Sequence, residues 1–409
     1  MLAAYSEGVS LSAGNTREYP TLPPELLSQI FYHYLRMSIP YNPGEGQGLG
    51  QKCLTEHLLL VCKSWYDAAT GDSSLWNEII LHPEITRVTP YRSLYSYIKV
   101  RSIRSRTHLL HVSISNNRDQ VGRLAYLKAY YQLLTTMPRW ERLFCYIECH
   151  DALSCITIHH LTASTPHLRE VVIRSSIRSV SDLSQILPET PNLEFLEISM
   201  PSIGPLSPSF YKSVTTASIQ TTDVRAWVDT ISQFERIHTL ILQPNRIMIS
   251  SAMLAARVGG PSLELPSVHT LIIVGPFNSL HFRLRFIDLP ALQTLEVDLS
   301  RSDAEKRWSG VNSGTRKRLS SLLNAGLRKL VFKSVWFDRW QDLVNVLLAT
   351  KGRVEELVCI DVTCTIQSGE EQKIDMSAIL MQRGVVSSAS ALTILCGFLK
   401  GHGIELYSN

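Results

Sequence analysis

The segment PALQTLEV, residues 290–297, carries a pattern of apolar residues that recurs through most of the chain. After a leading proline, its side chains Leu292, Leu295 and Val297 follow the spacing apolar-x-x-Leu-x-apolar. Seven segments repeat this spacing, in chain order PRWERLFC, PHLREVVI, PNLEFLEI, ERIHTLIL, PSVHTLII, AGLRKLVF and GRVEELVC, and SALTILCG is a weaker ninth copy. Short apolar segments that recur in this way predict a repeat architecture with one buried strand in each unit.

The intervals between these units indicate what separates the strands. From one first apolar residue to the next they run 28, 25, 44, 31, 24, 35, 27 and 38 residues, and the intervals of 44, 35 and 38 predict insertions. Helical patterns fill several gaps, one over residues 121–135, one capped by Thr222 and one capped by Asp338. Strand–helix units that bury their apolar faces only against neighbours predict a parallel ladder of strands with helices outside.

The N-terminal part has a helical pattern instead. The segment LPPELLSQIF, residues 22–31, opens a helix with two adjacent apolar stripes, Leu26, Ile30, Tyr34 and Leu27, Phe31, Leu35. A second helix is predicted to open near Thr55, to run through VCKSW and to stop at Gly71. A short element, SSLW, and a strand-like segment, EIILH, follow it.

These helical segments resemble an F-box. The resemblance rests on Leu-Pro-x-Glu-Leu-Leu-x-x-Ile-Phe at residues 22–31, Val-Cys-Lys-x-Trp at residues 61–65 and Leu-Trp at residues 75–76. The later units resemble the degenerate leucine-rich repeats that often follow an F-box, particularly in large fungal families. The resemblance implies a substrate-recognition adaptor of an SCF-type cullin–RING ubiquitin ligase. A Skp-type subunit would hold the F-box, and the repeats would hold a target protein that the sequence does not name.

The resemblance also implies which residues grip the Skp-type subunit. They are Leu22, Pro23, Leu26, Ile30, Phe31, Val61, Cys62, Trp65, Leu75 and Trp76. Short helices with surplus apolar surface resemble half of a shared core, as in obligate interfaces. The chain departs from the family in SIPYNPGEGQGLGQK, residues 38–52, which would obstruct docking if it packed across that face.

The sequence therefore predicts an α/β protein in which a small helical F-box precedes a leucine-rich-repeat-like α/β solenoid with a parallel strand ladder. The predicted parts are a flexible tail, an F-box-like domain with its loop insertion, a connecting segment with a strand, and the solenoid, over residues 1–18, 19–80, 81–116 and 117–409.

The composition narrows the possible partners. The net charge of +4 is too small to indicate nucleic acid, and no apolar run is long enough to span a membrane. The first residues lack a basic start and an apolar core, which predicts no secretory signal and an intracellular protein, cytoplasmic or nuclear or both. The eight irregularly spaced cysteines favour free thiols over a disulfide framework.

Two alternatives to the adaptor stay open. The first is a protein-interaction scaffold whose F-box-like helices only cap the solenoid. The second is an enzyme with a site on the concave face, although no nucleophile elbow, Walker motif or dinucleotide glycine pattern occurs in the sequence. We therefore predict a non-enzymatic protein without a cofactor.

Several clusters admit a functional or a structural interpretation. Cys145 lies near Cys149, His150 and Cys155 without the short paired spacing of a zinc site, and Cys145 and Cys359 occupy the third apolar position of their units, which predicts core residues and no metal. Basic residues that could bind phosphate or form a solvated face are Lys99, Arg101, Arg104 and Arg106. Candidate target-binding residues are His238, His269, Trp336, Phe337 and Trp340.

Overall fold

The fold is described from a computed structural model. It describes residues 22–37, 54–82, 85–116, 123–147, 161–175, 183, 187, 189–221, 223–243, 263–275, 287–300, 322, 326–337, 339–350, 353–368, 370–376, 378 and 387–401. The predicted tail, the insertion at 38–52, and Thr222, Asp338, Cys149, His150 and Cys155 lie outside these residues.

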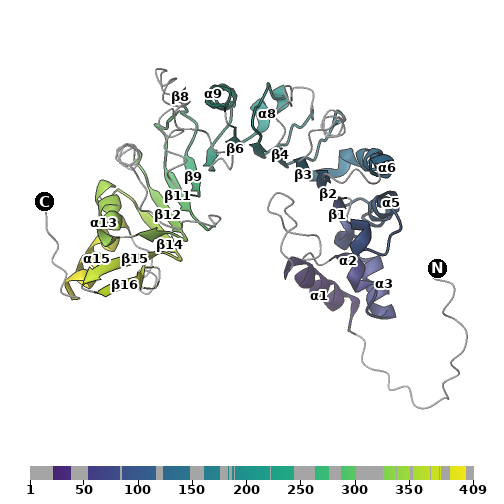
Figure 1. Ribbon diagram of the computed structural model, residues 1–409, viewed down its shortest axis with the longest axis horizontal. Helices are drawn as coiled ribbons and strands as arrows, with labels where there is room; N and C mark the ends of the chain where they lie inside the picture. The colour runs from purple at the N-terminus through teal and green to yellow at the C-terminus, as the bar shows by residue number, and fades with distance from the viewer. Residues whose placement is uncertain are drawn as a thin grey trace, which may run out of the picture.

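One parallel sheet of eleven strands runs through most of the chain. Each strand of this sheet pairs with the sheet strand that precedes it along the chain. The strands therefore lie in the sheet in the same order as in the sequence. Figure 1 shows the sheet along the inside of an arc, with α6, α9 and α13 on its outside. The strands are β1 (Glu78–Leu81), β2 (Leu110–Asn116), β3 (Trp140–Ile147), β4 (Glu170–Ser175), β5 (Phe195–Ser199), β6 (Thr216–Gln220), β7 (Thr239–Leu242), β9 (Thr270–Val274), β11 (Thr294–Asp298), β12 (Lys329–Lys333) and β14 (Glu356–Ile360).

The repeated leucine forms a continuous row across this sheet. Leu240, Leu271, Leu295, Leu330 and Leu357 are direct partners from strand to strand. All five are buried, as are the apolar residues two positions later. Since side chains alternate between the two faces of a strand, these rows face the helices while the residues between them face the inside of the arc. The eight stronger units are therefore confirmed as strands of one sheet.

Two predictions about the repeats are wrong. The ninth unit, SALTILCG, lies in helix α15 (Ser388–Gly401), where the buried residues Ala391 and Leu395 are four apart. The interval of 44 residues contains a further strand, β6, whose Ala217 pairs with Leu196 on one side and Leu240 on the other. β6 carries alanine where its neighbours carry leucine, which removed the signal of the repeat.

Three of the helices between the strands, α6, α9 and α13, lie where the sequence predicts them, but the predicted caps Thr222 and Asp338 are wrong, because the N-cap residues of α9 and α13 are Asp223 and Arg339. The helices that the structure describes between the strands are α4 (Ile85–Val88), α5 (Leu94–Arg104), α6 (Arg123–Leu134), η4 (Met137–Arg139), α8 (Pro208–Ser213), α9 (Val224–Ser232) and α13 (Trp340–Ala349). Asp223 caps α9, with its carboxylate accepting from the backbone N–H of Arg225 at 2.9 Å. The indole Nε1 of Trp227 donates to the carbonyl of Ile219 at 3.0 Å, which fixes α9 against β6.

Small sheets flank the main one towards the C-terminus. β8 (Leu263–Glu264) pairs with β10 (Ile287–Asp288), and β15 (Thr363–Ser368) lies between β13 (Trp336–Phe337) and β16 (Glu370–Asp375). Three strand ends of the main sheet lead into a left-handed residue: Gly275 at φ 87°, Ser334 at φ 52° and Asp361 at φ 52°.

The N-terminal helices form a separate small cluster. They are α1 (Pro24–Met37), α2 (Thr55–Leu58), α3 (Lys63–Gly71) and η3 (Ser73–Trp76). The predicted second helix is therefore two helices, with a turn through Leu59–Val61 and Cys62 as the N-cap of α3. Because the chain turns here, Val61 and Cys62 lie outside both helices and are exposed.

Candidate functional site

The N-terminal helices have a core of their own. Its buried residues are Leu27, Phe31, Leu58, Ala69, Leu75 and Trp76. The rings of Phe31 and Trp65 lie 4.9 Å apart between centroids, and the indole Nε1 of Trp76 donates to the carbonyl of Ala69 at 2.7 Å. These contacts hold α1, α3 and η3 together without help from a partner.

A second set of apolar side chains on the same helices faces away from this core. Leu22, Leu26 and Ile30 are 49%, 45% and 42% exposed, and Leu60 and Val61 in the turn are 73% and 57% exposed. The two stripes of α1 thus separate, since Leu27 and Phe31 point inward while Leu26 and Ile30 of the other stripe meet solvent and its Tyr34 is partly buried against the core. Apolar surface that a small helical unit leaves exposed is typical of a docking face.

The structure divides the ten residues predicted to grip a Skp-type subunit into three groups. The exposed ones, which a partner can reach, are Leu22, Pro23, Leu26, Ile30, Val61 and Cys62. Trp65 is half-buried against Phe31. Phe31, Leu75 and Trp76 are 0%, 6% and 0% exposed, so they shape the helices from inside rather than meet a partner directly.

Three exposed residues of this region were missed from the sequence. Tyr32, Leu60 and Tyr66 are 48%, 73% and 44% exposed. Tyr32 lies outside both apolar stripes of α1, and Leu60 lies in a turn that no glycine or proline marks. Only the position of the turn between α2 and α3 could have indicated Leu60.

A buried ion pair joins these helices to the first strand–helix unit of the sheet. The guanidinium of Arg101 on α5 donates Nε and Nη2 to the carboxylate of Glu56 on α2 at 2.9 and 2.6 Å, and its Nη1 donates to the carbonyl of Glu78 on β1. The side chains of Arg101 and Glu56 are 3% and 0% exposed. Burial alone would lower the pKa of Arg101, but the Glu56 carboxylate raises it above its ordinary value, so the guanidinium stays charged.

Aromatic rings surround this ion pair. Arg101 lies 5.4 Å from the ring centroid of Trp76 and 5.3 Å from that of Tyr97, while Arg104 lies 4.3 Å from the Trp76 ring. Burial raises the pKa of Tyr97 and raises that of Tyr91 to about 12, so both hydroxyls remain protonated. Trp76 therefore belongs to two contacts, the core of the N-terminal helices and the junction with α5.

The basic run on α5 is only partly available to a ligand. Arg101 is neutralised by Glu56, and Arg104 is directed onto Trp76. Lys99 and Arg106 remain exposed. The four cations therefore do not form one phosphate-binding site in this structure.

The candidate target-binding residues fall into two places. His238 and His269 precede neighbouring strands, with ring centroids 5.6 Å apart, and Nδ1 of His238 lies 3.2 Å from the carbonyl oxygen of Ser267. They form a pair at the entry edge of the sheet, His238 exposed and His269 half-buried. Phe337 and Trp340 are 0% and 8% exposed and belong to the core, and Trp336 is half-buried. The last three are therefore not a surface anchor.

The cysteines at the third apolar position are core residues, as predicted. Cys145 and Cys359 are buried, and burial raises the pKa of each thiol to about 12. Cys364 is also buried, with its pKa raised to about 11. Within the described part of the chain no group of side chains is arranged to hold a metal ion.

Thiol modification is expected to distinguish these cysteines by position. At about pH 8 an alkylating reagent should label the exposed Cys62 quickly and leave Cys145 and Cys359 unlabelled until the chain unfolds. Because the two buried thiols hold their protons more tightly when folded, their contribution to stability is complete below about pH 8.5 and is lost as the pH rises towards 12. Peptide mapping by mass spectrometry measures the labelling. Early labelling of Cys145 at neutral pH would contradict its place in the core.

Comparison with known proteins concerns the N-terminal helices. Residues 19–82 match the family model described as F-box-like, which covers α1, α2, α3, η3 and β1. F-box domains generally bind Skp-type subunits of ubiquitin ligases, and the match suggests an adaptor role for this part of the chain. No curated protein matches the chain. No helix in the described ranges is long and apolar enough to cross a membrane.

Proposed function

We propose that the chain is a substrate-recognition adaptor of an SCF-type cullin–RING ubiquitin ligase. The exposed apolar surface of the F-box-like helices would bind the Skp-type subunit, and a leucine-rich-repeat-like solenoid would bind a target protein. The observation that carries the proposal is the distribution of exposed large apolar side chains. Of the thirteen among the described residues, seven lie between Leu22 and Tyr66.

The leucine-rich-repeat part of the proposal is supported by the register of the sheet. One leucine-type position runs in direct pairing through successive strands, and helices follow on the outside of the arc (Figure 1). Left-handed residues after β9, β12 and β14 turn the chain away from the sheet at equivalent places. Such stacked units offer an extended inner surface, which repeat proteins use for binding.

A scaffold whose N-terminal helices serve only as a cap is the competing interpretation. The helices do pack on the end of the sheet, because Leu54 belongs to the main core and Glu56 pairs with Arg101. A cap, however, needs a polar outer face, and Leu26, Ile30 and Val61 give this one an apolar outer face. Truncation near residue 83 cannot separate the two functions, since it removes β1 and leaves Arg101 buried without its partner.

Substitution on the exposed face of α1 separates them without disturbing the core. The double variant Leu26→Asp, Ile30→Asp is expected to weaken binding to a purified Skp-type subunit by at least about 100-fold, because two charges would be desolvated in the interface. The matched control is Leu348→Asp, which places the same charge at a leucine on α13 that is 54% exposed, and this variant should bind like the unmodified chain. Calorimetric titration measures the affinity, and urea unfolding checks that both variants fold. An unmodified chain that forms no complex at micromolar concentration would overturn the proposal.

A further inference from the structure

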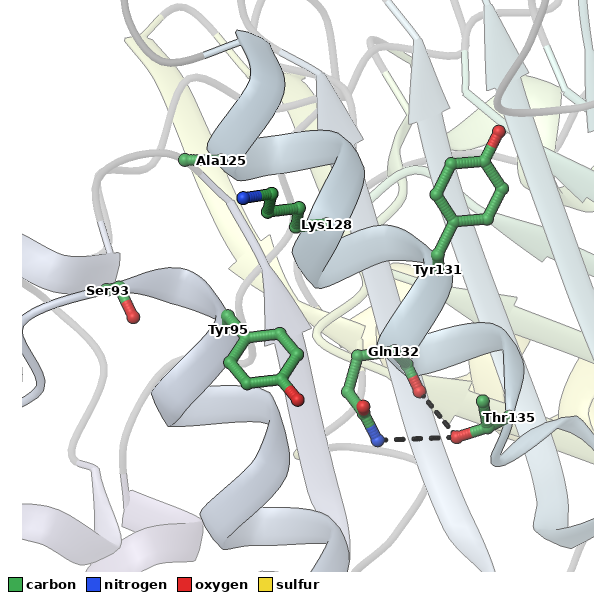
Figure 2. Close-up of a pocket in the computed structure, with 7 residues that line it drawn as sticks. All are labelled: Ser93, Tyr95, Ala125, Lys128, Tyr131, Gln132 and Thr135. Atoms are coloured by element: carbon green, nitrogen blue, oxygen red, sulfur yellow. Dashed lines mark hydrogen bonds between the residues drawn. The ribbon is translucent and has the colours of Figure 1, made fainter.

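A groove lies between α5 and α6, on the outer side of the arc and apart from the F-box-like helices. We call it the outer groove, with a volume of about 660 Å³ and the lining residues Ser93, Tyr95, Ala125, Lys128, Tyr131, Gln132 and Thr135. Figure 2 shows Tyr95 on α5 and Lys128 and Gln132 on α6 extending into the space between the two helices. Most of the lining surface is apolar, although four of the seven lining residues are polar and one of these, Lys128, is a cation.

The charged side chains of α5 and α6 are all basic. Neither α5 nor α6 contains an aspartate or a glutamate. Arg92 directly precedes the lining residue Ser93, and Lys99 lies one helical turn after Tyr95; both are exposed, as is Lys128 on α6. The inward cations Arg101 and Arg104 are already engaged with Glu56 and Trp76. The remaining exposed cations have no acidic neighbour on either helix, so they favour an anionic ligand.

The same two helices carry the second concentration of exposed apolar side chains in the described chain. Ile103 and Leu124 are 64% and 68% exposed, and Tyr95 and Tyr131 are 41% and 48% exposed. Outside the N-terminal helices and this pair, only two further large apolar side chains of the described residues are exposed. Apolar residues gathered in this way, next to a groove, are typical of a protein-interaction site.

We propose that the outer groove binds an acidic amphipathic helix of a partner protein. Its apolar side chains would enter the groove beside Tyr95, and its carboxylates would meet Lys128, Lys99 and Arg92. Packing of one helix in the groove between two others is an established mode of peptide recognition. The mixture of apolar and cationic groups favours this ligand over nucleic acid, which needs a denser row of exposed cations for its phosphates. The inference is independent of the proposed ligase function.

A synthetic peptide of about 16 residues tests the inference, with leucine and phenylalanine at helical spacing and glutamate on the flanks. Fluorescence anisotropy with the labelled peptide and the full chain should show saturable binding that weakens as salt is raised to about 0.5 M. Lys128→Glu is expected to weaken binding about tenfold. Tyr95→Ser should weaken it by a similar factor through lost apolar contact. Lys212→Glu on α8 makes the same change of charge at an exposed site elsewhere and should leave binding unchanged.

Two control probes decide between this ligand and others. A peptide with lysine in place of each glutamate should not bind, and a single-stranded oligonucleotide of similar length should bind more weakly than the acidic peptide. The inference is overturned if the acidic peptide shows no saturable binding, if the two peptides bind equally, if the oligonucleotide binds more tightly, or if Lys128→Glu and Lys212→Glu have the same effect. Far-UV circular dichroism confirms that each variant retains its fold.

Discussion

Replacing Arg101 with methionine is expected to lower the free energy of unfolding by about 3–5 kcal/mol. The Glu56 carboxylate would remain fully buried with its charge and without the two hydrogen bonds that it now accepts. The substitution also removes the bond to the Glu78 carbonyl and the contact with the Trp76 ring. Urea unfolding followed by tryptophan fluorescence measures the loss, because Trp76 lies at the junction.

Two further variants make this prediction specific. Lys99→Met removes an exposed cation from the same helix and is expected to change stability by no more than about 0.5 kcal/mol. The double variant Arg101→Met, Glu56→Leu removes both charges and should recover most of the loss, because an apolar pair has no buried charge to satisfy. If Arg101→Met costs no more than Lys99→Met, the ion pair does not join the two parts of the chain.

Replacing Leu271 with alanine is expected to cost about 2–5 kcal/mol. Leu271 is 0% exposed and lies between Leu240 and Leu295 in the central row of the sheet, so its loss leaves a cavity lined on both sides. Its neighbour Ile272 is the matched control, since it points to the opposite face of β9 and is only half-buried. Ile272→Ala should cost roughly 1 kcal/mol. Similar losses for both, measured by thermal or urea unfolding, would contradict the assignment of the two faces.

The parallel sheet could be predicted because its signal repeats. Eight units carry the same apolar spacing, and their registers confirm it. β6 could not be predicted in this way, since Ala217 replaces the leucine and Ser218 follows it. The neighbouring strands β5 and β7 supply hydrogen-bonding partners for β6, although the side chains of β6 do not show the repeat pattern. Tertiary context therefore overrides the local pattern there.

The N-terminal helices show a different limit of sequence reasoning. The periodicity of apolar residues runs unbroken from Leu58 to Ala69, and no glycine or proline marks the turn that separates α2 from α3. Periodicity alone also cannot tell which of two adjacent stripes turns inward, so it does not distinguish the buried Phe31 from the exposed Ile30. Glu56 and Arg101 are 45 positions apart in the sequence, so no local sequence pattern predicts that they form an ion pair.

The strict pairing of each strand with the next gives the arc a definite length. Neighbouring strands lie about 4.8 Å apart, so the steps from β1 to β14 span roughly 50 Å along the sheet. The Glu56–Arg101 pair fixes the N-terminal helices to the beginning of the sheet. The distance from Ile30 to a later strand is therefore set by the number of strands between them. Deleting one strand–helix unit would bring the far end closer by about 5 Å and rotate it by roughly 20–25°. The distance between the N-terminal helices and a protein bound along the sheet would therefore change in steps of one strand.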